Sequence, residues 1–366
     1  MEALMQSSPG ARTLINDRWR DYFAGCGYLG LQSHPALVQA AIETLQQYGL
    51  STATSRGGFG EHPVYQHVEQ TAAEFFESER AIYFVSGYLG NTILLQGLQG
   101  DYEQIFVDRD SHFSVWDGVQ NAGIPVTPFQ HCDPEDLSAC CRAKLRPGER
   151  PLVITDGVFP ISGEIAPVRD YVDALAPYDG AILCLDDAHA TGVIGEKGQG
   201  TLEHFGVQGK GRYTTYTLSK ALAGHGGVIA QEATVVEKLV RNSTVPGATS
   251  PSPLPAAAAA ARALELVRGD SSLRRRLWAN VRHAKEGVRE LGWPVANTPV
   301  PILCLGARPG LDLARLQSEL FARDICVAHV TRYSSTPPGG ALRIAIFATH
   351  TAEQIDRMIA ELGALV

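Results

Sequence analysis

Two short segments carry the side chains with the clearest chemistry in this chain. They are Asp186-Asp187-Ala188-His189 and Thr217-Leu218-Ser219-Lys220. A lysine can form a Schiff base with an aldehyde cofactor, and a carboxylate can keep a pyridine nitrogen protonated. A histidine can hydrogen-bond a ring phenol, and a threonine can bind a phosphate oxygen. Together the two segments supply the groups that hold and tune pyridoxal 5'-phosphate (PLP).

Each segment has a plainer interpretation when it is taken alone. An Asp-x-x-His after a strand is usually a helix cap or a surface turn, and Thr-x-Ser-Lys is a common tetrapeptide. Both segments, however, follow strand-like runs, since Leu183-Cys184-Leu185 ends at Asp186 and Tyr213–Thr217 ends just before Lys220. Ligands bind outside the carboxyl ends of strands in open α/β sheets, so this pair in this order favours a cofactor site.

The segments that must position these residues alternate between strand-like and helix-like patterns. Strands are expected at Ala81–Val85, Gln104–Val107, Leu152–Thr155, Ala181–Leu185, Tyr213–Thr217 and Gly227–Ala230. Helices between them are expected at Thr92–Leu98, Ser114–Asn121, Pro134–Leu145 and Val168–Leu175. The alternation is typical of βαβ units in a mostly parallel sheet, whose right-handed crossovers gather the strand ends at one edge.

A proline-rich segment, Val245–Pro255, interrupts the alternation and is not expected to form a regular helix. Beyond it we expect helices at Ala256–Val267 and Ser271–Leu291 and strands at Val300–Leu305, Ile325–His329 and Leu342–Phe347. A chain of 366 residues is long for one compact core. We therefore expect a large domain from 46 to 255, a small α+β domain from 256 to 366, and an N-terminal segment, 1–45, packed on the small domain.

Other strand ends carry further candidates. Ser86-Gly87-Tyr88 precedes a helix, where backbone N–H groups favour a phosphate, although it could also be a plain βα turn. His112 could lie flat on a cofactor ring, or it could be a capping or core histidine. Asp156 places another polar residue at the same sheet edge.

In order from about residue 20 to the C-terminus, the chain resembles the α-oxoamine synthases, the branch of fold-type I PLP enzymes that contains 8-amino-7-oxononanoate synthase and 2-amino-3-ketobutyrate CoA ligase. The resembling segments are Tyr28-Leu29-Gly30-Leu31, Ser55-Arg56, Ser86-Gly87-Tyr88, Asp110-Ser111-His112, Asp156-Gly157-Val158-Phe159, the run 186–195, Gly198-Gln199-Gly200 and Leu342-Arg343-Ile344. The run 186–195 is the most specific of them. Departures from the family pattern, Cys26-Gly27 and Pro160, fall on positions that concern substrates rather than PLP.

The resemblance implies an α/β transferase of fold type I. Its mostly parallel sheet would have seven strands with helices on both faces, beside a smaller α+β C-terminal domain. In the catalytic group, Lys220 would carry the Schiff base and move the substrate α-proton. Asp186 would pair with the pyridine nitrogen, His189 would bond the ring phenol oxygen, and His112 would stack on the ring.

The resemblance also implies the remaining binding residues. The full set expected to bind PLP is Ser86, Gly87, Tyr88, His112, Asp156, Asp186, His189, Thr217, Lys220 and Thr249. Thr249 would reach the phosphate of a neighbouring subunit, because such sites form at a dimer interface. The substrate candidates are Arg343, Arg332 and Ser55. Arg343 suits a bidentate bond to the amino-acid carboxylate, although it could instead form a structural ion pair.

The implied reaction joins an amino acid to an acyl-CoA thioester and gives an α-amino ketone. The alternatives are an aminotransferase, an aldol or decarboxylase-type lyase, or a regulator that binds PLP without catalysis. The net charge of −8 argues against nucleic acid as a partner. The cysteine spacing fits no zinc motif, and we expect no metal, signal peptide or membrane span. Seven scattered cysteines suit a cytoplasmic protein, expected to be a homodimer.

Overall fold

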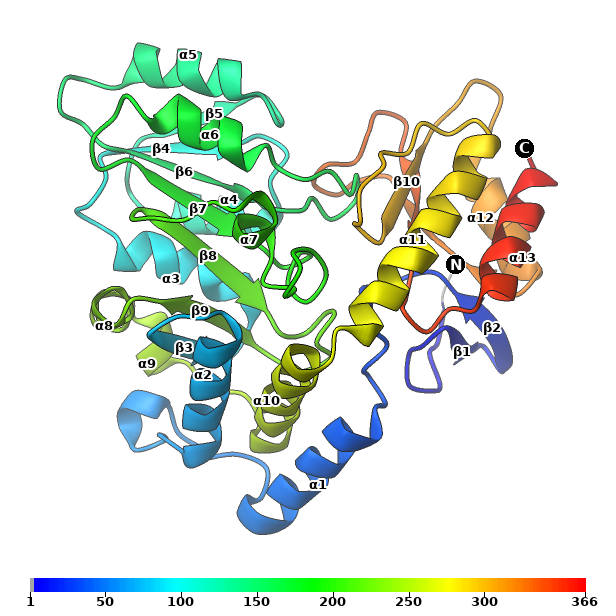
Figure 1. Cartoon of the computed structure of the whole chain (residues 1–366), viewed down its shortest axis with the longest axis horizontal. Coiled ribbons are helices and arrows are strands. Elements are labelled where there is room, and N and C mark those ends of the chain that lie inside the picture. Colours follow the sequence, from blue (N-terminus) through cyan, green and yellow to red (C-terminus); the bar gives the residue numbers. More distant parts are fainter. Residues whose placement is uncertain (1–2) are drawn as a thin grey trace.

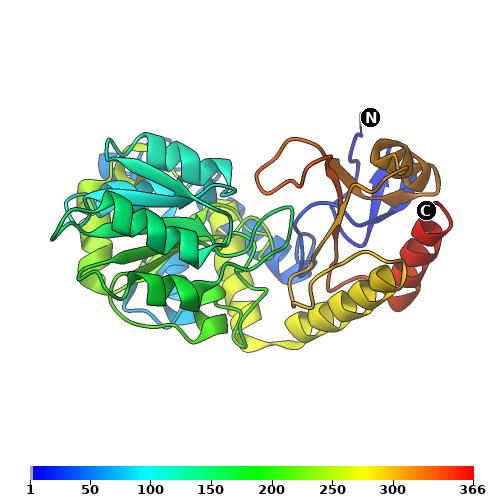
Figure 2. The same cartoon turned by 90° about the horizontal axis from the view of Figure 1, so that it is seen from above.

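The computed structural model describes residues 3–366 as two lobes joined by long helices (Figure 1; Figure 2). The larger lobe holds a seven-stranded sheet in the order β3-β9-β8-β7-β6-β4-β5. Its strands are β3 (Arg80–Phe84), β4 (Gln104–Asp108), β5 (Val126–Phe129), β6 (Pro151–Asp156), β7 (Ile182–Asp186), β8 (Arg212–Thr217) and β9 (Gly227–Gln231). Only β9 runs opposite to the other six strands, so the expected, mostly parallel α/β sheet is confirmed.

Helices cover both faces of this sheet because its central strands are apolar on both sides. In β4, Ile105 and Val107 pack into the core cluster beneath α3, α4 and α8, while Phe106 between them packs with α5 and α6 on the other face. This is the period of two that a pleated strand imposes. The helices of this lobe are α2 (Pro63–Phe75), α3 (Gly90–Gly97), α4 (Phe113–Gln120), α5 (Pro134–Lys144), α6 (Val168–Leu175), α7 (Thr201–Phe205), α8 (Ala233–Asn242) and α9 (Val245–Ala248), with the short 3₁₀ helices η1 (Arg56–Gly58) and η2 (Gly87–Leu89).

The smaller lobe contains two three-stranded sheets. One is antiparallel, in the order β10-β13-β12, and the other joins β1 and β2 near the N-terminus to β11. The strands are β1 (Arg12–Ile15), β2 (Arg18–Tyr22), β10 (Ile302–Gly306), β11 (Ile325–Cys326), β12 (Ala328–Val330) and β13 (Ala341–Ala345). The helices α11 (Ser272–Glu290), α12 (Leu313–Ala322) and α13 (Ala352–Gly363) pack on them. Helix α10 (Leu254–Gly269) lies against α1 (Pro35–Tyr48) and α2 between the lobes.

The structure differs from the expected elements in a few places. Strands β1, β2 and β5 were not expected, and Ile325–His329 is split between β11 and β12. As expected, Val245–Pro255 is not one regular helix, although the short helix α9 forms within it and α10 begins at Leu254, two residues before the expected Ala256. In both helices proline occupies the first turn, where its missing N–H has no intrahelical partner to lose. The domain boundaries remain predictions. No helix within residues 3–366 is long and apolar enough to cross a bilayer.

Candidate functional site

The carboxyl ends of the parallel strands bring the expected residues to one edge of the sheet. Asp156 and Asp186 are the last residues of β6 and β7 and are paired in register. Thr217 ends β8, and Lys220 follows three residues later. His112 is the N-cap of α4, just after β4. The chain therefore gathers two carboxylates, an imidazole and an amine from four separate βα units.

Asp186 is buried and held by three donors. Its Oδ2 accepts from Asn91 Nδ2 at 2.7 Å and from Ser114 Oγ at 3.4 Å, and its Oδ1 accepts from the backbone N–H of Ala188 at 3.0 Å. The Asp187 carboxylate points to the start of α7, where it accepts hydrogen bonds from Thr201 N at 2.7 Å and from the Thr201 hydroxyl. Burial raises the pKa of Asp187 to about 7. Asp187 is thus a buried cap of α7, and Asp186 is the carboxylate that belongs to the strand-end cluster.

A buried chain of hydrogen bonds links Lys220 to Arg343. His189 Nε2 lies 2.8 Å from Lys220 Nζ, and His189 Nδ1 lies 2.7 Å from the hydroxyl of Tyr28. Arg343 Nη2 donates to that hydroxyl at 2.9 Å. A guanidinium can only donate, so the Tyr28 proton is available for Nδ1. With an uncharged Lys220, Nε2 then carries the imidazole proton and donates to Nζ.

Burial favours the uncharged forms of the lysine and the histidine in this chain of hydrogen bonds. It lowers the pKa of Lys220, and it lowers the pKa of His189 well below its usual value; at His189, any positive charge on Lys220 and the charge of Arg343 act in the same direction. The imidazole is therefore neutral. A neutral imidazole with a proton on Nε2 can donate to a ligand oxygen that enters between it and the lysine.

His112 is fixed at the rim of the same edge. Its backbone N–H donates to Asp156 Oδ2 at 2.7 Å, its Nδ1 lies 2.7 Å from Ser114 Oγ, and its Nε2 lies 2.8 Å from the hydroxyl of Tyr333. Burial and the neighbouring Asp186 raise the pKa of Asp156 well above its usual value. Asp156 thus orients the backbone at His112, and Tyr333 closes the rim from the smaller lobe.

Glycines let the expected phosphate turn approach β8 closely. A Cβ on Gly87 would lie 2.1 Å from Thr217 Oγ1, and one on Gly90 would lie 1.7 Å from Thr215 Oγ1. Ser86 Oγ accepts from the backbone N–H of Tyr88 at 3.3 Å and so shapes the turn. Only glycine allows this approach, which places the Ser86–Tyr88 turn beside Thr217 as a cradle of N–H and O–H donors.

Three expected residues lie outside this cluster. Thr249 follows α9 and donates its hydroxyl proton to Val245 O at 2.7 Å. Ser55 precedes η1, where its carbonyl accepts from Gly58 and Gly60. Arg332 is exposed in the loop after β12. Their roles remain predictions.

No role was predicted from the sequence for three residues of the site, which are Tyr28, Asn91 and Tyr333. Tyr28 belongs to the resembling segment Tyr28–Leu31 but was given no role there, and Asn91 follows the Ser86–Tyr88 turn by three residues, so both positions carried a signal. Tyr333 carried none, because its contact with His112 joins segments 221 residues apart in the chain.

Comparisons with known proteins find relatives along almost the whole chain. Residues 26–362 match the family described as aminotransferase class I and II. An 8-amino-7-oxononanoate synthase from Nitrosomonas europaea is 33% identical over 352 residues, which cover 94% of this chain and 90% of that protein. One from Alkaliphilus metalliredigens is 30% identical over 358 residues, 97% of this chain and 90% of that protein. The structure of a serine palmitoyltransferase variant from S. paucimobilis, with bound PLP–myriocin aldimine, superposes with a TM-score of 0.92 at 25% identity, covering 100% of this chain and 92% of the other.

Proposed function

Because the chain belongs to the aminotransferase class I and II family and, within it, to the α-oxoamine synthases, we propose that it is a PLP-dependent acyltransferase. It condenses an amino acid with an acyl-CoA thioester and gives an α-amino ketone, as the names of its 8-amino-7-oxononanoate synthase relatives suggest. The observation that carries the proposal is the strand-end cluster, where the Asp186 carboxylate, the His189 imidazole and the Lys220 amine meet.

The residues of this cluster fit PLP. Asp186 would hold the ring nitrogen, since its carboxylate is buried and fixed by Asn91. His189 would donate its Nε2 proton to the phenol oxygen, and the Ser86–Tyr88 turn with Thr217 would hold the phosphate. His112 would cover one face of the ring. When bound, PLP supplies an electron sink for the charge that develops at the substrate α-carbon.

The remaining chemistry falls to the protein's own groups. Burial lowers the pKa of Lys220, so a larger share of its amine is uncharged and able to take a proton from the α-carbon. Tyr28 and Arg343 keep His189 oriented toward that amine. The hydrogen bond between His112 Nε2 and the Tyr333 hydroxyl links the two lobes at the rim of the site.

Arg343 and Arg332 share the proposed binding of the amino-acid carboxylate. Arg343 donates from Nε to Pro160 O at 2.7 Å and from Nη1 to Gly25 O at 2.9 Å, besides its bond to Tyr28. Its Nη2 also contacts Cys26 Sγ at 3.7 Å, which leaves one Nη1 hydrogen for a substrate. A single bond, rather than a bidentate pair, suits this geometry. Arg332, exposed in the loop after β12, stays a candidate for a second donor.

A cytoplasmic homodimer with shared sites completes the proposal. Phe59 is fully exposed, and Tyr88 and Phe113 are also well exposed beside the site. Exposed aromatic side chains of this size suit contact with a second subunit, which would bring Thr249 and Ser55 toward the neighbouring site. The seven cysteines are free thiols, which fits a reducing compartment.

The test is a matrix of amino acids and acyl-CoAs incubated with the PLP-loaded protein, with CoA release and products measured together. Stoichiometric CoA and α-amino ketone from one pair, both absent in Lys220→Ala, would support acyl transfer. Conversion of an amino acid to a keto acid or aldehyde without acyl-CoA would instead favour an aminotransferase or lyase on the same scaffold.

A further inference from the structure

Within residues 3–366, Arg343 is a buried cation that has no carboxylate among its hydrogen-bond partners. Its residue is 5% exposed, and it donates to two backbone carbonyls, to the Tyr28 hydroxyl and to the Cys26 thiol. Buried charges are normally paired with an opposite charge, because an unpaired one loses its hydration without compensation. The guanidinium therefore suits an anionic ligand, such as the carboxylate of the proposed amino-acid substrate.

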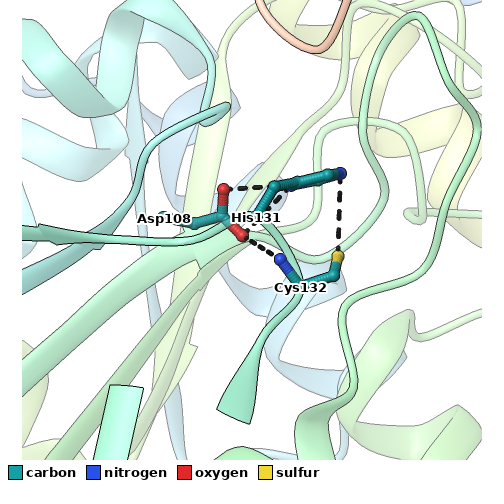
Figure 3. A group of neighbouring side chains, drawn as sticks. All are labelled: Asp108, His131 and Cys132. Atoms are coloured by element: carbon teal, nitrogen blue, oxygen red, sulfur yellow. Dashed lines mark hydrogen bonds and ion pairs between the residues drawn. The ribbon is translucent and has the colours of Figure 1, made fainter. Parts of the chain in front are cut away.

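His131, in the larger lobe, shows the opposite arrangement. Asp108 ends β4 and lies 3.0 Å from His131 Nδ1, and it also accepts from the backbone N–H of Cys132 at 2.8 Å (Figure 3). Glu164 Oε2 lies 3.0 Å from His131 Nε2. A charged imidazole at this position is compensated by a carboxylate at each ring nitrogen, whereas the charge of Arg343 is compensated by none of its own partners.

The hydrogen bonds between Arg343 and Lys220 all run in one direction. Arg343 Nη2 donates to the Tyr28 hydroxyl at 2.9 Å, and that hydroxyl donates to His189 Nδ1 at 2.7 Å. His189 Nε2 then donates across 2.8 Å to Lys220 Nζ. Burial raises the pKa of Tyr28 well above its usual value, so the hydroxyl keeps the proton that it donates. Because each group accepts at one atom and donates at the next, a change of charge at Arg343 polarises the whole chain of bonds.

Tyr28 is the link between parts of the molecule that are far apart in the sequence. Tyr28 follows β2, Arg343 lies in β13, and His189 follows β7. The Tyr28 ring is fully buried, and its carbonyl accepts from Ala348 N at 2.7 Å, which holds it against the smaller lobe. We propose that Tyr28 is a positioning residue that transmits the binding of a substrate carboxylate at Arg343 to the Nε2 proton of His189. The inference rests on the proposed function, because that function supplies the amino-acid carboxylate.

A carboxylate bound to Arg343 would offset its positive charge. The Tyr28 hydroxyl would then donate less strongly to His189 Nδ1, and Nε2 would hold its proton more tightly. Protons in this cluster would be lost less readily, so the midpoint of proton loss should move to higher pH. The other charged and titratable groups near His189 and Lys220 are Arg343, His112, Asp186, Asp156 and Cys26. Removal of the Tyr28 hydroxyl alone replaces none of these groups.

The first measurement follows the absorbance of the PLP-loaded protein against pH, without an amino acid or acyl-CoA. Propionate is the probe, because it carries a carboxylate but no amine that could react with PLP, and sodium chloride at the same ionic strength is the salt control. Propionate should raise the midpoint of the absorbance change in the unsubstituted protein, and Tyr28→Phe should lose most of that rise. The rise that remains in Tyr28→Phe is the direct effect of the carboxylate charge. Because no acyl donor is present, a failure of acyl transfer would leave this result unchanged.

The second measurement needs no cofactor. NMR of the protein with ¹⁵N-labelled histidine distinguishes a proton on Nε2 from a proton on Nδ1, and the signal missing from His189→Gln identifies His189. The proton should lie on Nε2 in the unsubstituted protein, because Nδ1 accepts from Tyr28. In Tyr28→Phe the proton should be shared between the two nitrogens.

The matched control is Tyr102→Phe, which removes another buried hydroxyl that donates to Leu95 O at 2.9 Å, outside this chain of bonds. It should behave as the unsubstituted protein does in both measurements. The proposal would be overturned by a propionate-induced rise in Tyr28→Phe as large as in the unsubstituted protein, or by a proton that stays on Nε2 in that variant. An unsubstituted protein whose midpoint responds to propionate no more than to sodium chloride would overturn it even if Tyr28→Phe failed to fold.

Discussion

Replacing Asp186 with asparagine removes one charge while the shape of the side chain stays the same. The oxygen of the new amide can still accept from Ala188 N, but its NH₂ group would face the Asn91 NH₂ group, now 2.7 Å from the carboxylate. Asn91 Oδ1 is buried and has no partner within residues 3–366. A flip of the Asn91 amide therefore restores a donor–acceptor pair. We expect the Asp186→Asn variant to fold.

The chemistry should suffer much more than the fold. The carboxylate would no longer stabilise a positive charge on the ring nitrogen, which weakens the electron sink in the transition state. Removing one preorganised electrostatic contact of this kind typically costs about 3–4 kcal/mol, which corresponds to a rate about 10²–10³-fold lower. The loss should appear in the rate of α-proton removal, before any acyl donor is involved.

The assay is exchange of the amino-acid α-proton for deuterium, followed by NMR with PLP-saturated protein and no acyl-CoA. Asp187→Asn is the control, because Asp187 bonds Thr201 and should affect stability rather than exchange. An exchange rate for Asp186→Asn within about tenfold of the unsubstituted protein, well short of the predicted drop, would refute the role given to this carboxylate. A larger loss in Asp187→Asn than in Asp186→Asn would assign the ring nitrogen to the neighbouring residue.

Substitutions of Tyr28, Arg332 and Lys285 should change stability or binding in ways that depend on their burial. Tyr28→Phe leaves Arg343 Nη2 and His189 Nδ1 without their shared partner, so the free energy of unfolding measured in guanidinium should fall by about 1–3 kcal/mol. An unchanged free energy of unfolding would show that the Tyr28 hydroxyl does not stabilise the fold through these two bonds. Arg332→Ala should weaken amino-acid binding in a spectral titration without changing the melting temperature, because Arg332 is exposed, whereas Arg343→Ala should lower both. Burial lowers the pKa of Lys285 to about 7, so the unfolded chain binds more protons than the folded chain between about pH 7 and 10. Lys285 alone should therefore add about 4 kcal/mol of stability across that window, so the difference in the free energy of unfolding between the unsubstituted protein and Lys285→Met should change by that amount between the two pH values.

Much of the strand-end site could be predicted because parallel strands place their carboxyl ends at one edge. Any polar residue that follows a buried strand, such as Asp156, Asp186 or His112, falls there by topology. The strands themselves were recognisable from apolar runs. Strand β5 was not, because it is a short edge strand that contains Pro128. Strand β2 was missed because its sequence, Arg18–Tyr22, is mostly charged.

Contacts between the lobes could not be predicted in the same way. The bonds of Arg343 with Tyr28 and Pro160 join residues 315 and 183 positions apart, and no periodicity encodes them. These arrangements depend on how strands order within the sheet, which a single sequence does not specify.

The most direct test of the central claim is to find which side chain bonds PLP. The PLP-loaded protein is reduced with borohydride, digested and analysed by mass spectrometry. The strand-end site predicts a phosphopyridoxyl group on Lys220, and no stable label on any residue of Lys220→Ala. A label on another lysine, such as Lys210 or Lys285, or equal labelling in Lys220→Ala, would contradict the site.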